Sequence, residues 1–138
     1  MKYKILPIAG DASYREFYRL KSKSNSKIFV LTNREKYKNL IVYTAINRFL
    51  RNKGILTPRL YSYDFSRGLI VIEDFGDLSF YKIIIKEKDK LKIYKRLIDL
   101  LLKIQKIKPK NKIKINGDRM HVINKYSNKY LLEESNLF

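Results

Sequence analysis

The sequence contains no cysteine and a single histidine, His121. Without cysteine the chain can form no disulfide, hold no metal through thiolates and use no cysteine nucleophile. A lone histidine also excludes metal sites built from two histidines. No apolar run approaches the roughly 18 residues of a membrane span, and the chain starts with only a short apolar stretch before Gly10. We therefore expect neither a membrane partner nor a signal peptide, and a cytoplasmic location.

Acidic residues are scarce, with 13 Asp and Glu against 31 Lys and Arg, so the net charge is +18. Lys, Ile, Asn and Tyr, whose codons are A/T-rich, make up 61 of the 138 residues. Codon bias therefore accounts for much of the charge, whereas a surface that reads nucleic acid would more often use Arg. Residues 55–81 differ, because they have a net charge of −2 between two segments, 1–54 and 82–114, of +10 each. Codon bias does not explain this acidic and aromatic stretch.

Five short segments in the first half of the chain have the patterns of strands: residues alternate in character at 14–20 and 60–65, and short apolar runs occupy 4–8, 28–31 and 69–72. We expect these strands at 4–8, 14–20, 28–31, 60–65 and 69–72. Between the third and fourth, Val42, Ala45, Ile46 and Phe49 follow helical spacing and predict a helix over 39–53. Gly54 is placed to end that helix.

The segment after residue 77 is expected to be helical, with helices at 79–86, 91–107 and 126–138 and a loop or weak strand at 110–116. The order β-β-β-α-β-β followed by helices predicts an α+β fold, in which a five-stranded antiparallel sheet carries one helix. We divide the chain into a lobe at 1–77 and a helical region at 78–138.

Four motifs occur in a fixed order along the chain. They read GDASYREFYRL at 10–20, GILTPRLYSYD at 54–64, GLIVIEDFGD at 68–77 and YSNKYLLEESNLF at 126–138. Together they resemble the N-terminal part of the aminoglycoside phosphotransferase and choline kinase superfamily. Within that superfamily they are most similar to the bacterial anomeric kinases of N-acetylmuramate and N-acetylglucosamine, which act in cell-wall recycling.

This resemblance implies a protein-kinase-like small lobe followed by the first helices of the large lobe. It implies an ATP-dependent phosphotransferase that acts on an amino-sugar hydroxyl, with ATP and Mg²⁺ as cofactors and nucleotide and sugar as partners. The implied nucleotide-binding residues are Gly10, Asp11, Ala12, Ser13, Arg15 and Arg19, together with Glu73, Asp74 and Phe75 in the hinge.

The chemistry of both segments fits a nucleotide. A turn of small residues lets backbone N–H groups approach phosphate oxygens. Ser13 adds a hydroxyl, and Arg15 or Arg19 adds a positive charge. Backbone groups around Glu73 to Phe75 would bind adenine. The plainer alternatives are a hairpin turn in which Asp11 and Ser13 cap their own backbone, and hinge carboxylates that simply begin the next helix.

The sequence also departs from the kinase pattern. Kinases place a Lys on the third strand to hold phosphates, but this strand ends Val-Leu-Thr-Asn at 30–33, which leaves Arg15, Arg19 and Lys36 as candidate cations. The sequence Asp-Phe-Gly at 74–76 follows the fifth strand, and no His-Arg-Asp segment lies upstream of it. We therefore interpret it as part of the hinge rather than as the metal-binding motif of kinases.

The sequence offers no catalytic or metal-binding residue of a kinase. His121 lacks the Asp that an H-x-D-x-x-x-x-N catalytic loop requires. We therefore expect the nucleotide-binding part of a kinase, ending before the catalytic loop and inactive alone, with the acceptor contacts and Mg²⁺ ligands in the missing half. The alternatives are a basic nucleic-acid-binding module that uses the Lys-rich helix and the 103–114 tract and a catalytically inactive regulatory partner. We expect no specific nucleic acid as a partner.

Overall fold

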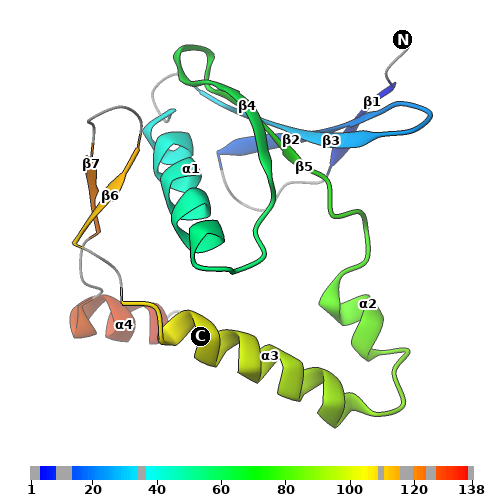
Figure 1. Cartoon of the computed structure of the whole chain (residues 1–138), viewed down its shortest axis with the longest axis vertical. Coiled ribbons are helices and arrows are strands. Elements are labelled where there is room, and N and C mark those ends of the chain that lie inside the picture. Colours follow the sequence, from blue (N-terminus) through cyan, green and yellow to red (C-terminus); the bar gives the residue numbers. More distant parts are fainter. Residues whose placement is uncertain are drawn as a thin grey trace.

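The structure is a computed structural model that describes residues 4–8, 14–33, 37–108, 111–115, 120–123 and 127–136. The first half of the chain forms the predicted β-β-β-α-β-β order (Figure 1). Its elements are β1 (Lys4–Ile8), β2 (Arg15–Lys21), β3 (Ser26–Thr32), α1 (Tyr37–Asn52), β4 (Leu60–Asp64), the 3₁₀ turn η2 (Phe65–Arg67) and β5 (Leu69–Glu73).

These strands form one antiparallel sheet in the order β1-β2-β3-β5-β4. The first three strands are a meander of consecutive neighbours. The chain then crosses through α1, returns in β4 and reverses at η2, so that β5 pairs with β3 between Lys27–Glu73 and Leu31–Leu69. The predicted five-stranded sheet with one helix is confirmed.

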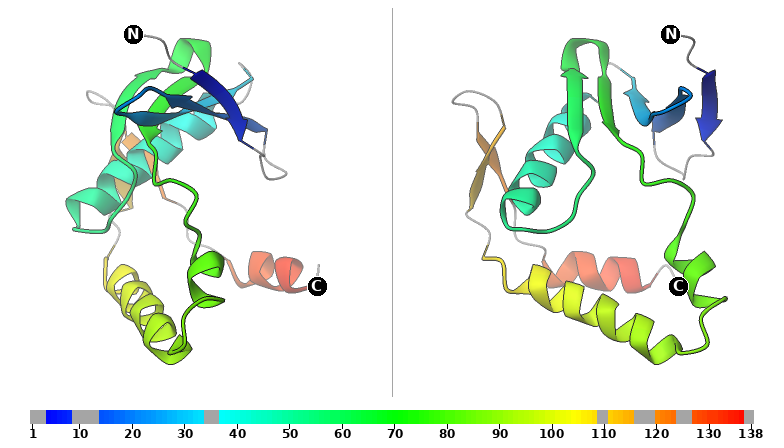
Figure 2. Two further views of the ribbon diagram at one scale, coloured as in Figure 1. Left: turned by 90° about the vertical axis from the view of Figure 1, so that its right-hand side faces the viewer. Right: turned by 45° about the vertical axis from the view of Figure 1, so that its right-hand side comes forward.

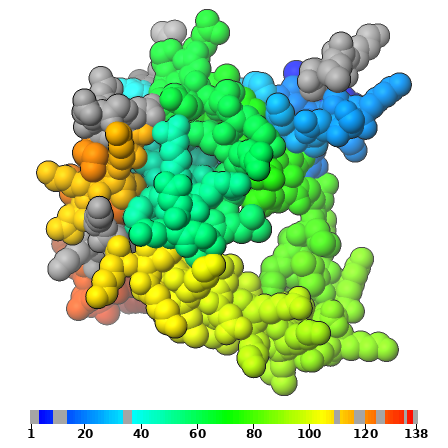
Figure 3. All heavy atoms as spheres, viewed as in Figure 1, coloured from blue at the N-terminus to red at the C-terminus, as the bar shows by residue number. Residues whose placement is uncertain are grey.

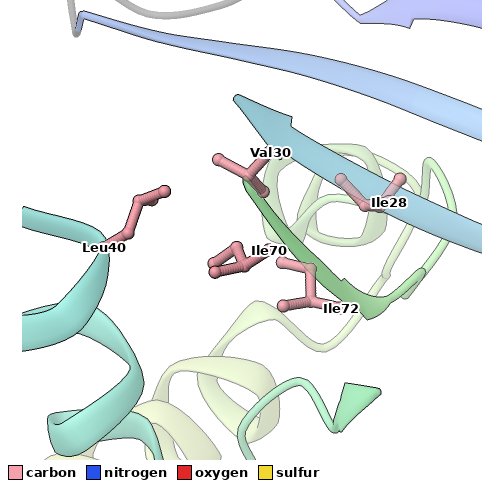
Figure 4. Packing of buried hydrophobic residues seen from close by; sticks show 5 residues of the cluster. All are labelled: Ile28, Val30, Leu40, Ile70 and Ile72. Atoms are coloured by element: carbon pink, nitrogen blue, oxygen red, sulfur yellow. The ribbon is translucent and has the colours of Figure 1, made fainter. Parts of the chain in front are cut away.

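The core lies between the sheet and α1. Alternation along β3 and β5 directs Ile28, Val30, Ile70 and Ile72 to the same face, where they meet Leu40 of α1 (Figure 4). Leu40 and Ile70 are fully buried. Both strands are nearly continuous apolar runs, which is typical of central strands buried against a helix.

The buried side of α1 differs from the predicted one. The helix buries Leu40, Thr44, Ala45 and Asn47, whereas Ile46 of the predicted stripe is exposed. Asn47 is buried because it holds the return to β4: its side-chain amide donates to the carbonyl of Pro58 over 2.9 Å, whereas the buried Thr44 hydroxyl donates to the carbonyl of Ile41 in its own helix. Apolar spacing alone does not reveal this use of a buried amide.

The two turns at glycines match the sequence. Gly54 has φ 73° and follows the end of α1, where its N–H donates to the carbonyl of Arg51. Gly68 has φ 64° after η2 and packs directly against the backbone of Thr32, where a side chain would clash. Positive φ strains any residue with a Cβ, which is why glycine occupies both positions.

The helical region contains α2 (Phe80–Ile84), α3 (Lys90–Gln105) and α4 (Asn128–Ser135), which confirms a helix in each of the three predicted segments. Residues 126, 137 and 138 of the last predicted helix lie outside the described residues. The tract at 110–116 forms a strand, β6 (Lys112–Lys114), paired with β7 (Met120–Val122). This hairpin lies beside α1, and Ile113 is buried (Figure 1). Figure 2 shows α2 to α4 on the same side of the sheet as α1.

Helix α3 exposes much of its apolar surface. No residue of α3 is buried, and Leu91, Tyr94, Ile98 and Leu101 are exposed, Leu91 by 81%. In Figure 3 an opening separates α1 from the chain that runs from β5 to α2. No helix in the described part of the chain is long and apolar enough to cross a membrane.

Candidate functional site

A small cavity lies beneath the sheet, between β2, β3, β5 and α1. Its volume is about 110 Å³, and the residues that line it are Arg15, Phe17, Val30, Leu40, Tyr43, Ile70 and Ile72. Strand alternation explains the set, because odd-numbered residues of β2 and even-numbered residues of β3 and β5 share this face. Among the described residues that line the cavity, Arg15 alone is charged.

Arg15 and Arg19 stand at opposite ends of this face of β2. Four residues at about 3.4 Å per residue separate their Cα atoms by about 14 Å. The Arg15 guanidinium lies over the ring of Phe17, at 5.9 Å from its centroid. The face therefore has an apolar centre with a cation at the Arg15 end.

The connector that follows β5 borders the other end. Lys27–Glu73 is the last pair of the β3–β5 ladder, so the backbone groups of Asp74 and Phe75 lie outside the sheet. Glu73 forms two hydrogen bonds with Arg59, the residue just before β4. Its N–H donates to the carbonyl of Arg59 over 2.8 Å, and its carboxylate accepts from the Arg59 N–H over 2.9 Å.

Arg19 fixes this connector to the sheet. Its Nε and Nη2 donate to the two carboxylate oxygens of Asp74 over 2.7 and 3.2 Å. Its Nη1 and Nη2 donate to Asp77 over 2.9 and 2.8 Å. Asp74 also accepts hydrogen bonds from the Ser26 hydroxyl and, over 2.8 Å, from the Gly76 N–H. In this cluster, the Arg19 clamp, the Asp74 side chain is only 5% exposed, whereas Asp77 is open to water.

The clamp keeps its members charged. Burial alone would raise the pKa of Asp74, but hydrogen bonds from Ser26, Arg19 and Gly76 outweigh it and hold that pKa below its ordinary value. The hydrogen bonds from Arg19 lower the pKa of Asp77. The same bonds, to Asp77 and to Asp74, raise the pKa of Arg19. At neutral pH the clamp is therefore an ion-pair network with one cation and two anions.

The structure brings together part of the predicted site. Arg15 lines the cavity, Glu73 ends β5, and Asp74 and Phe75 form the start of the connector. Arg19 lies on the same face, but its guanidinium is bound to Asp74 and Asp77. The predicted residues Gly10, Asp11, Ala12, Ser13 and Lys36 lie outside the described residues.

The alternative in which the hinge carboxylates begin the next helix is wrong. The first turn of α2 contains no acidic residue, and Ser79 caps it by accepting from the Lys82 N–H. Asp74 and Asp77 instead bind Arg19 across 55 and 58 positions of sequence.

Sequence reasoning missed the apolar lining of the cavity and the clamp. Strands β3 and β5 are apolar on both faces, and Phe17 stands between two arginines on β2, so the sequence pattern does not show which residues turn toward α1. The clamp has a weak signal, namely one acidic stretch in a strongly basic chain. Charge balance suggests that such a stretch has basic partners, but it does not say which.

The described residues do not fit a metal site. Among them, no group of three or more His, Asp or Glu side chains could hold a metal ion. The two carboxylates that do approach each other, Asp74 and Asp77, share Arg19 between them.

No family model matches this sequence, and a search of curated proteins found no relative. What the chain does is therefore inferred from its own residues and fold.

Proposed function

We propose that this chain is the nucleotide-binding part of an ATP-dependent phosphotransferase of the aminoglycoside phosphotransferase and choline kinase type, which acts on an amino-sugar hydroxyl. The observation that carries this proposal is the cavity beneath β2, β3 and β5. It has Arg15 at one end, and Ile72, two residues before Asp74, at the other. An elongated ligand with a flat apolar ring and an anionic tail matches that arrangement.

In this proposal adenine packs against Phe17, Val30 and Ile72, and the backbone at Asp74 and Phe75 binds its edge. The phosphates extend toward Arg15. A cavity of about 110 Å³ is smaller than the roughly 300–1,000 Å³ of ordinary ligand pockets. The nucleotide would therefore be partly open to solvent here, and its affinity would be weak.

In this proposal the Arg19 clamp positions the connector and does not itself contact phosphate. It joins β2 to the connector through four hydrogen bonds, so it sets where the backbone of Asp74 and Phe75 lies relative to the cavity. Its two carboxylates already neutralise the guanidinium, which leaves Arg15 as the better candidate for the phosphate end.

The exposed surface of α3 supports a larger assembly. An amphipathic helix normally buries its apolar stripe, and contiguous exposed apolar patches mark interaction surfaces. Leu91, Tyr94, Ile98 and Leu101 present such a surface. A two-lobed enzyme would cover it with the rest of the large lobe.

In complete enzymes of this kind, Mg²⁺ and a carboxylate base supply the chemistry of phosphoryl transfer. The sequence contains no H-x-D-x-x-x-x-N segment. We therefore expect this chain alone to hold a nucleotide without transferring its phosphate. A coupled assay with ATP, Mg²⁺ and N-acetylmuramate or N-acetylglucosamine should give no ADP above the rate without protein. Turnover that depends on the sugar would contradict this expectation.

Replacing Arg15 by alanine should weaken the binding of ATP roughly three- to tenfold, because a charge-assisted contact to phosphate is lost. Adenosine should bind unchanged, since it lacks phosphates. Isothermal titration of both ligands measures the two effects. Arg67→Ala removes the same charge at a highly exposed position outside the site and should leave both affinities unchanged. An equal loss for ATP and adenosine in Arg15→Ala would place the phosphates elsewhere.

A further inference from the structure

The sheet face that points away from α1 is apolar at its centre. A hollow of about 300 Å³ on this face is lined by Ile5, Tyr18, Leu20, Phe29 and Leu31, and we call this surface the outer face. An antiparallel sheet with one solvated face normally alternates apolar residues inside with polar residues outside. Strands β2 and β3 break that rule, because their outward side chains are also mostly apolar.

The described elements leave the outer face open. Helices α1 to α4 and the β6–β7 hairpin all lie on the opposite side of the sheet (Figures 1 and 2). Ile5 at the rim of the hollow is 63% exposed. A protein that keeps such a surface in water generally pairs it with another surface.

The two faces of the sheet differ in charge, because the face toward α1 is basic and the outer face is not. The pairing register places Lys4, Arg15, Arg19 and Lys21 on the side of α1. The outer face carries Lys27, whose ammonium lies over the Tyr61 ring, together with the acidic residues Glu16, Asp64 and Glu73. In a chain of net charge +18, most surfaces of two copies repel each other. The outer face has no net positive charge, so two outer faces do not repel each other.

Two of these charges, Glu16 and Lys27, come opposite each other across a two-fold axis, and Lys27 also has Glu73 beside it on β5. Glu16 pairs with Leu31 at one end of the β2–β3 ladder, and Lys27 pairs with Leu20 at the other. A two-fold axis in the plane between two stacked sheets, parallel to the inter-strand hydrogen bonds, reverses the strand direction. It therefore brings the Glu16 end of one copy over the Lys27 end of the other, while the apolar centres meet.

The area suffices for a weak dimer. Five strands about 4.8 Å apart and about six residues long present a face of roughly 500 Å². Two copies then bury about 1,000 Å², which is the lower limit for a specific interface. We propose that two copies of this chain associate through the outer face as a two-fold, sheet-on-sheet dimer. The cavity beneath the sheet faces away from this contact and stays accessible.

Sedimentation velocity of the full chain over a range of concentrations tests the dimer. We expect a reversible monomer–dimer equilibrium, weakened roughly tenfold or more by Phe29→Lys, because a charge would then be buried at the contact. Leu101→Lys makes the same kind of change on exposed α3 and should leave the equilibrium unchanged. A monomer at every concentration would overturn the proposal, as would a dimer lost in Leu101→Lys but kept in Phe29→Lys.

A charge exchange tests the two-fold geometry. Glu16→Lys and Lys27→Glu should each weaken the dimer about threefold or more, because each places like charges opposite one another twice. The double variant restores opposite charges and should recover most of the wild-type affinity. Losses that simply add in the double variant would contradict the proposed pairing. Circular dichroism of each variant shows whether it remains folded.

Discussion

Ile70→Ala is expected to lower the free energy of unfolding by about 3–4 kcal/mol, the cost of removing a large apolar side chain from a packed core. Ile70 is fully buried and belongs to the cluster with Val30 and Leu40. Because domains are stable by only about 5–15 kcal/mol, the variant should lose a large share of its stability. Urea denaturation followed by circular dichroism measures the loss.

Ile98→Ala is the matched control for this change. Ile98 is exposed on α3, so the same truncation should cost less than about 0.5 kcal/mol. A loss below about 1 kcal/mol for Ile70→Ala would mean that α1 does not pack on the sheet as described.

Arg19→Met is expected to cost about 2–3 kcal/mol, because it leaves the largely buried carboxylate of Asp74 without its cation. Methionine keeps much of the apolar stem of the arginine. Arg67→Met removes the highly exposed ion pair with Asp64 and should change stability by less than about 0.5 kcal/mol. Equal effects of the two substitutions would show that the Arg19 clamp adds nothing beyond a surface ion pair.

The effect of Arg19→Met should depend on pH. In the folded wild type the pKa of Asp74 lies below its ordinary value of 3.8. A lowered pKa contributes stability that is present above the unfolded value and is lost as pH falls through the folded value. The difference between wild type and Arg19→Met should therefore be full near neutral pH and shrink below about pH 4. A difference that grows with acidification would contradict this assignment.

Local patterns were enough to predict the elements around the site. Strand β5 is a run of apolar residues between a Gly turn and an acidic segment, and α1 ends two residues before Gly54, with Pro58 soon after. These signals are short-range, because turn residues and side-chain periodicity act within a few positions. The sheet, its single helix and the place of the connector after β5 follow from them.

Long-range partners could not be predicted in the same way. Arg19 has two carboxylates as partners, 55 and 58 positions away, and only the folded register brings them together. The Lys-Ile alternation at 112–115 fits a loop as well as a strand until β7 pairs with it. The buried side of α1 was misjudged because Asn47 turns inward to bind Pro58, a role that apolar spacing hides.

The central claim is that a nucleotide binds between Arg15 and the connector after β5. A two-dimensional ¹H–¹⁵N NMR titration of the whole chain tests it most directly. ATP should shift the amide signals of 15–17 and of 72–76, and adenosine should shift those of 72–76 alone. Signals of α3, whose lysines would attract any polyanion, should move only at low salt. Shifts confined to α3, or none in 72–76 with either ligand, would contradict the account.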